Sequence, residues 1–141
     1  MSLEDKSNEN LRLVDNYVKS RKYPNIVASR AYYAVYQRIK HYLQNHETDY
    51  IKFLNESGTL FDPDNKYKHS LINLVLLNYT FQRNKGKKID QRELNQLLRF
   101  HALRHMREKA DYEKNDITEP EAKASCTYAK SLTPIIDKYL S

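Results

Sequence analysis

The side chains best suited to chemistry gather within residues 94–112, LNQLLRFHALRHMREKADY. They follow one another at spacings of three or four residues, so on a helix they form one polar stripe. An arginine binds phosphate through two N–H groups, and a histidine exchanges a proton near neutral pH. The members of this polar stripe are His101, Arg104, Arg107 and Asp111, with His105 and Glu108 beside them.

Cleavage of RNA without a metal needs a base, an acid and a cation beside the phosphate. We expect Arg104 or Arg107 to hold the phosphate and His105 to exchange the proton, with His101 one turn earlier as the alternative. The competing interpretation is a solvated helix face. Its Arg107–Asp111 ion pair would then contribute only about 0.3–0.5 kcal/mol if exposed.

No metal site or other cofactor is expected. No set of His, Asp and Glu residues has convincing metal-ligand spacing, because the His101–His105 pair lacks the glutamate that adjoins the first histidine of the HExxH motif. Cys126 is the only cysteine. A single thiol excludes an internal disulfide and a multi-thiolate metal site, so we expect Cys126 to be packed in the core.

Apolar residues of the same segment must position the polar stripe. They recur at helical spacing, which predicts that residues 94–112 form one helix with its other face buried. These residues are Leu94, Leu97, Leu98, Phe100, Ala102, Leu103, Met106 and Ala110.

Four more helices are predicted around this one. Cap residues and prolines place them at about residues 3–19, 24–44 and 62–82 and from 119 onward, where Thr118 and Glu121 form a capping box. Pro134 should kink or end the last helix and leave residues 137–141 as a tail. Residues 44–62 should form a polar connection, the most mobile part of the chain, in which a short apolar patch forms one or two helical turns ended by Gly58.

Two of these helices have predicted core faces. On residues 24–44 the face is Ala28, Tyr32, Val35, Ile39, Tyr42 and Leu43, and on residues 62–82 it is Tyr67, Leu71, Leu74, Asn78 and Phe81, with Ile72 and Val75 adjoining. The chain has only two glycines and no alternating run rich in Val and Ile. The fold class is therefore all-α, an up-and-down bundle of about five helices in one domain of residues 1–141.

The formal net charge is +6, and the surplus is concentrated in residues 83–109, which hold nine basic and three acidic side chains. A local basic patch suits a polyanion such as RNA. No signal-peptide pattern opens the chain, and no apolar run approaches the roughly 18 residues of a membrane span. We therefore expect a soluble cytoplasmic protein that does not bind membranes.

Three stretches occur in a suggestive order: SRAYYAVYQRIKHYL, KHSLINLVLLN, and REKADY followed by a capped terminal helix. Together they resemble the HEPN domain superfamily over roughly residues 11–136. The resemblance implies a helical bundle that commonly forms a homodimer, with polar residues of both late helices around one cleft. It also implies metal-independent endoribonuclease activity in toxin–antitoxin or phage-defence systems, in some cases with a nucleotidyltransferase-type antitoxin as partner.

The resemblance assigns the family's signature positions to residues of this chain. They are Arg30 and Tyr33 on the Tyr-rich helix, and Arg107, Ala110, Asp111 and Tyr112 on the late helix. Catalytic members carry an arginine followed four to six residues later by a histidine, and no histidine stands at that distance after Arg104 or Arg107. At that distance from Arg107 stand Asp111 and Tyr112.

Three hypotheses follow. The first is an RNA-binding or RNA-cleaving HEPN protein, with Arg104, His105 and Arg107 as catalytic candidates. The second is a non-catalytic module that binds a nucleotide, an RNA end or a protein, in which Arg30 pairs with Asp111 across two helices. The third is a helical interaction protein unrelated to HEPN. The candidate RNA- or nucleotide-binding residues are Arg30, Tyr33, His69, His101, Asp111 and Tyr112.

Overall fold

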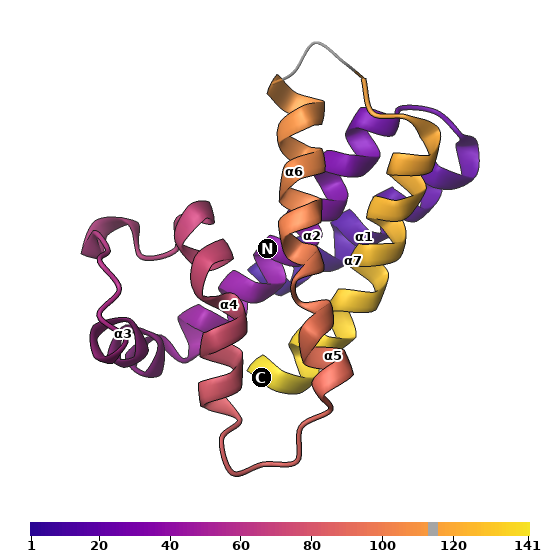
Figure 1. Cartoon of the computed structure of the whole chain (residues 1–141). Coiled ribbons are helices and arrows are strands. Elements are labelled where there is room, and N and C mark those ends of the chain that lie inside the picture. The colour runs from indigo at the N-terminus through magenta and orange to yellow at the C-terminus, as the bar shows by residue number, and fades with distance from the viewer. Residues whose placement is uncertain (113–115) are drawn as a thin grey trace.

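The structure is a computed structural model that describes residues 1–112 and 116–141. Those residues form helices packed as a bundle, with no strand among them (Figure 1), as the all-α prediction required. The elements are α1 Leu3–Ser20, α2 Pro24–Asn45, α3 Glu47–Glu56, the 3₁₀ helix η1 Pro63–Asn65, α4 His69–Arg83, α5 Gln91–Gln96, α6 Arg99–Tyr112 and α7 Glu119–Leu140.

Helix α2 is the central element of the bundle. It packs against α1, α6 and α7 along much of its length, and its C-terminal part reaches the side where α3 and α4 lie (Figure 1). Ala31 and Ala34 are fully buried, so α1 approaches α2 closely enough for Ser7 Oγ to donate a hydrogen bond to the Ala34 carbonyl at 2.6 Å. The predicted core face of α2 is buried except for half-buried Tyr42.

Helices α1, α2 and α7 start at the predicted residues. Ser2 and Thr118 are the N-caps of α1 and α7, and each forms a complete capping box, with Asp5 and Glu121 respectively. Asp90 caps α5 by accepting from two backbone N–H groups. Each cap satisfies N–H groups that the first turn of a helix leaves unpaired.

The single helix predicted for residues 94–112 is wrong. A turn at residues 97–98 separates α5 from α6, and successive i to i−3 hydrogen bonds run from the N–H groups of residues 97, 98, 100 and 101. This tighter winding changes the register, because 3₁₀ geometry has three residues per turn. Leu97 stays buried, but Leu98, predicted to be in the core, is 50% exposed.

The connection predicted for residues 44–62 is also wrong in part, because helix α3 occupies Glu47–Glu56. Tyr50 and Leu54 are fully buried on one face of α3. The Tyr50 hydroxyl donates to the Lys66 carbonyl at 2.7 Å, and the Tyr50 ring packs edge-on against Tyr79 of α4. These contacts hold α3 against α4 and the segment before it. Gly58, at φ 70°, follows the helix end as expected.

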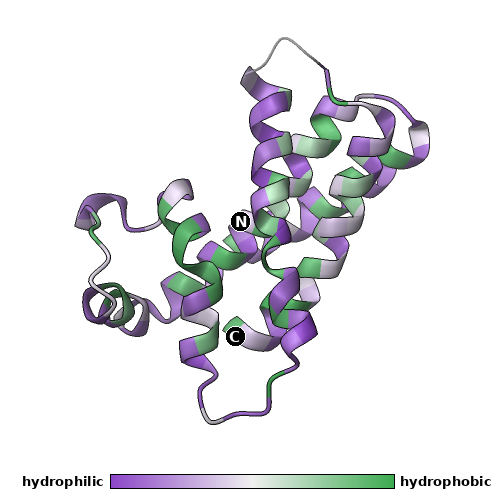
Figure 2. Ribbon diagram, in the orientation of Figure 1, coloured by the Kyte–Doolittle hydropathy of each residue, from purple (hydrophilic) through white to green (hydrophobic). Residues whose placement is uncertain are grey.

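Helix α4 starts at His69 instead of Asp62, which caps the short η1. The predicted core face is rotated, since Leu74 is 70% exposed and Phe81 is 48% exposed. Figure 2 shows apolar residues along much of α4, so periodicity alone could not identify the buried side. The residues that are buried are Leu71, Ile72, Val75, Leu76, Tyr79 and Thr80.

Helix α7 continues through Pro134 to Leu140, so the predicted tail at residues 137–141 is helical up to Leu140. Pro134 removes one backbone hydrogen bond from the helix interior, at a cost of about 3 kcal/mol. Burial of Ile136, Tyr139 and Leu140 beyond it offsets that cost. The predicted packing of Cys126 is confirmed, because its side chain is buried. No described helix is long and apolar enough to span a bilayer.

Candidate functional site

Arg107 of α6 lies at the centre of a group of aromatic side chains. Its Nη2 donates hydrogen bonds to Tyr33 Oη at 2.8 Å and to Tyr112 Oη at 3.2 Å. Its Cζ lies 5.6, 5.4 and 5.2 Å from the ring centres of Tyr32, Tyr33 and Tyr112. Because a guanidinium is attracted to aromatic faces at such distances, these contacts orient the cation. We call Arg107, Tyr32, Tyr33, Asp111 and Tyr112 the Arg107 cluster.

Asp111 completes the cluster from the next turn of α6. Its Oδ2 lies 3.1 Å from Arg107 Nε, which confirms the ion pair expected within one helix. Nε is buried and is not aligned for a hydrogen bond, so this contact is electrostatic. The alternative pairing of Arg30 with Asp111 is wrong. Arg30 is exposed, and its Nη1 makes only a long 3.4 Å hydrogen bond to Asn10 of α1.

His69 is brought to this cluster by the start of α4. Its Nδ1 lies 2.5 Å from the Tyr32 hydroxyl, and its ring stacks on Tyr36 with the centres 3.9 Å apart. Burial lowers the pKa of His69 below its ordinary value, and the positive charges of Arg107 and Arg104 lower it further. The imidazole is therefore neutral at physiological pH. Burial also raises the pKa of Tyr32, which stays protonated.

The polar stripe of α6 continues from the cluster toward its own N-terminus. Arg104 lies with Nε 3.1 Å from Glu108 Oε1, and about a quarter of its side chain, 27%, is exposed. One turn earlier, His101 Nδ1 is hydrogen-bonded at 2.6 Å to Nδ2 of Asn73, which follows His69 by one turn on α4. Residues of α4 thus face the stripe of α6.

Six of the nine predicted site residues lie together. Tyr33, Arg107, Asp111 and Tyr112 are in direct contact, and His69 and Arg104 adjoin them. His105 lies on the exposed side of α6 and forms no hydrogen bond or ion pair with the described residues. Its catalytic assignment stays a prediction, as do the roles predicted for the other members.

The residues missed from sequence are Tyr32, Tyr36 and Asn73. The spacing of Tyr32 predicts a core position, and the ring is buried, yet its hydroxyl is also the partner of His69. The available signal was the run of tyrosines on α2. A buried tyrosine needs a hydrogen-bond partner for its hydroxyl, and a histidine is a suitable one.

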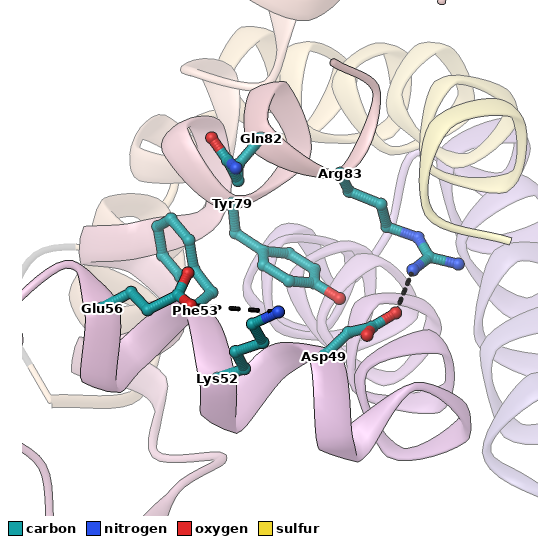
Figure 3. A pocket seen from close by; sticks show the side chains of 7 residues that line it. All are labelled: Asp49, Lys52, Phe53, Glu56, Tyr79, Gln82 and Arg83. Carbon is teal, nitrogen blue, oxygen red and sulfur yellow. Dashed lines mark hydrogen bonds and ion pairs between the residues drawn. The ribbon is translucent and has the colours of Figure 1, made fainter. Parts of the chain in front are cut away.

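A separate pocket lies between α3 and α4 (Figure 3), and none of its residues belongs to the Arg107 cluster. Its charges pair with one another. Arg83 Nη1 is 3.1 Å from Asp49, and Lys52 Nζ is 3.9 Å from Glu56. Because each charge already has an opposite partner, this pocket has no net charge with which to attract a ligand. Its lining residues are Asp49, Lys52, Phe53, Glu56, Tyr79, Gln82 and Arg83.

Among the described residues, no three His, Cys, Asp or Glu side chains are grouped so that they could hold a metal ion. No protein-family model, curated protein or solved structure matches this chain. Function has therefore to be inferred from the side chains of the Arg107 cluster and their neighbours.

Proposed function

We propose that this chain is an RNA-binding protein of the HEPN type and that single-stranded RNA binds over the Arg107 cluster, Arg104 and His69. The observation that carries the proposal is the position of Arg107, whose guanidinium is held by Tyr33 and Tyr112 and lies among three tyrosine rings. Arginine supplies the phosphate contact. Tyr33 and Tyr112, which are accessible while Tyr32 is buried, supply surfaces on which unpaired bases stack.

Arg104 extends this surface along α6. One helical turn is about 5.4 Å, so Arg104 and Arg107 can contact neighbouring phosphates of one strand. The exposed Lys85, Lys87 and Lys88 follow α4 and add positive charge to the molecule. Single-stranded RNA fits this arrangement better than duplex RNA because its bases are free to stack on tyrosine.

Fluorescence anisotropy with a labelled single-stranded RNA tests the proposal. We expect Arg104→Gln, which removes a partly exposed cation, to weaken binding about 10-fold, in keeping with about 1.5–3 kcal/mol for a hydrogen bond to a charged group. The matched controls are Arg12→Gln on α1 and Lys52→Gln on α3, which remove the same charge elsewhere and should leave affinity unchanged. Equal losses in all three variants would show that only net charge matters.

A second candidate function is metal-independent cleavage of the bound RNA, and the position of His69 favours it. When Nδ1–H of the neutral ring donates to Tyr32, Nε2 is a proton acceptor, and two guanidinium groups lie near enough to lower the pKa of the ring. Nε2 would take the 2′-hydroxyl proton, and the 2′ oxygen would bond to phosphorus. The bond from phosphorus to the 5′ oxygen then breaks, and that oxygen takes a proton from water.

Cleavage is tested with labelled RNA in the presence of a metal chelator. The His69 proposal expects a 2′,3′-cyclic phosphate product from the wild type and from His105→Gln, and none from His69→Gln. Loss only in His105→Gln would instead support the assignment made from sequence. Binding without any wild-type cleavage would support the alternative, a non-catalytic HEPN module for nucleotides or protein partners.

The resemblance to HEPN proteins also supports a setting and two partners for this proposal. The setting is a toxin–antitoxin or phage-defence system, and the partners are a second copy of the chain and a nucleotidyltransferase-type antitoxin. Leu74 and Phe81 leave apolar surface exposed on α4, which a protein partner would cover. Light scattering of the purified chain tests the homodimer directly.

A further inference from the structure

Beside the Arg107 cluster, the surface is hollowed between α1, α2 and the end of α6. The groove has a volume of ≈ 420 Å³, within the range of about 300–1,000 Å³ that is typical of small-molecule sites. Its lining includes Tyr17, Ile26, Ser29, Arg30, Tyr33 and Asp111. Tyr33 and Asp111 also belong to the Arg107 cluster, so the groove adjoins the proposed RNA surface.

We propose that this groove selects guanine, with the base held by Asp111 and its 5′ phosphate by Arg30. This inference rests on the proposed function, because it names the nucleotide that the RNA surface recognises. The recognition is of a guanine nucleotide at an unpaired position or at an RNA end, since the groove admits a base only when it is not paired.

The walls of the groove suit a flat aromatic ring. Tyr17 and Tyr33 contribute rings from α1 and α2, and exposed Ile26 contributes an aliphatic surface. Tyr33 cannot swing freely because its hydroxyl accepts the 2.8 Å hydrogen bond from Arg107. Tyr17 is packed edge-on against Tyr23, with the two ring centres 5.7 Å apart. A base that enters the groove can stack on these aromatic rings.

Asp111 supplies the selectivity for the base. Its Oδ2 is beside Arg107, while Oδ1 takes part in no hydrogen bond with the described residues. An ionised carboxylate only accepts hydrogen bonds. Guanine presents two adjacent donors, N1–H and the exocyclic amine, to such a group. Adenine and cytosine present an amine beside a bare ring nitrogen, and uracil presents one N–H between two carbonyl groups.

Arg30 is the phosphate-binding group. Arg30 is exposed. Its one hydrogen bond to a described residue is the long 3.4 Å contact with Asn10, so the guanidinium can turn toward a ligand. Ser29 lines the same groove, and its hydroxyl makes no hydrogen bond with the described residues. A guanidinium and a free hydroxyl together are suited to phosphate oxygens.

Calorimetric titration with mononucleotides tests the inference on the full chain. We expect the wild type to bind GMP about 10- to 100-fold more tightly than AMP, because adenine would leave one carboxylate oxygen facing a ring nitrogen. IMP, which lacks the exocyclic amine, should bind with intermediate affinity. Similar affinities for GMP and AMP, or no binding of either, would overturn the proposal.

Two variants separate recognition from folding. Asp111→Asn replaces one hydrogen-bond acceptor by a donor. It should therefore weaken the binding of GMP and strengthen the binding of XMP, whose base presents one donor beside one carbonyl. A gain of XMP binding cannot come from damage to the fold. Arg30→Gln, at an exposed position, should weaken GMP about 10-fold and leave the nucleoside guanosine unchanged. Glu108→Gln, a matched loss of charge outside the groove on α6, should keep the GMP preference.

The same proteins in the RNA-binding assay distinguish the two proposals. RNA that binds without any preference for guanine would overturn the groove assignment and leave the RNA-binding proposal intact. Selective GMP binding without RNA binding would overturn the RNA-binding proposal.

Discussion

Arg107 joins tyrosine rings from two helices, and its hydrogen bonds determine which of its N–H groups can reach a ligand. Nη2 is used by Tyr33 and Tyr112, and Nε faces Asp111. Nη1 takes part in no hydrogen bond with the described residues. Because the guanidinium is planar and is held at Nη2 and Nε, its Nη1 edge is oriented before a phosphate arrives, which lowers the entropic cost of binding.

His69 predicts a pH dependence of stability. Its pKa is lowered in the folded chain below the ordinary value of 6.5, by burial first and then by Arg107 and Arg104. At pH values above 6.5 both the folded and unfolded forms are neutral, and stability is unaffected. As the pH falls below that value, the unfolded chain binds a proton that the folded chain resists, so the folded state loses stability.

Thermal unfolding of the wild type between about pH 7.5 and pH 5.5 measures this effect. We expect the melting temperature to fall on acidification, and to fall less in His69→Gln. His46 contributes in the same direction, since burial and then Arg83 lower its pKa, so His46→Gln is the matched comparison. The same pH dependence in the wild type and His69→Gln would contradict the burial of a neutral imidazole.

At the scale of elements, the sequence predicts what short-range chemistry decides. The capping box at Thr118 and the buried stripe of α2 are confirmed because they depend on neighbouring residues and on one clear periodicity. Helix α4 carries apolar residues on more than one side, since Leu74 and Phe81 are exposed, so its buried side depends on tertiary packing. The break at residues 97–98 carries no glycine or proline, so no local residue signal predicts it.

The part of the candidate site that lies on α6 could be predicted from the sequence, whereas the part contributed by α2 and α4 could not. The spacing of Arg104, Arg107 and Asp111 on one helix places them on one stripe, as observed. The approach of His69 to Tyr32 joins residues that are 37 positions apart, which no local pattern contains. Tertiary packing of α4 against α2 therefore determines which histidine lies at the cluster.

Pro134 provides a prediction about α7. In Pro134→Ala the helix regains a backbone N–H in its interior, so we expect the free energy of unfolding to rise by about 1–2 kcal/mol. The gain is smaller than the full cost of the proline because alanine makes the unfolded chain more flexible. Urea denaturation measures the change. Pro120→Ala is the matched control in the first turn of the same helix, where the missing N–H costs nothing, and it should not raise stability. A fall in stability for Pro134→Ala would contradict the account of α7.

At the scale of the whole molecule, the positive charge divides into paired and unpaired parts. Arg83, Arg104 and Lys109 each lie beside a carboxylate, whereas Lys85, Lys87 and Lys88 are exposed and form no ion pair with the described residues. Charges of the exposed kind attract a polyanion over distance without selecting it. Selection falls to the oriented groups of the Arg107 cluster and its groove.

The most direct test of this account is to locate the RNA on the protein. In an NMR titration of the ¹⁵N-labelled chain with a short single-stranded RNA, we predict the largest shift changes at residues 101–112 of α6 and at residues 29–36 of α2. Changes confined to the lysines at 85–88, or to the pocket between α3 and α4, would contradict the assignment of the Arg107 cluster as the RNA-binding site.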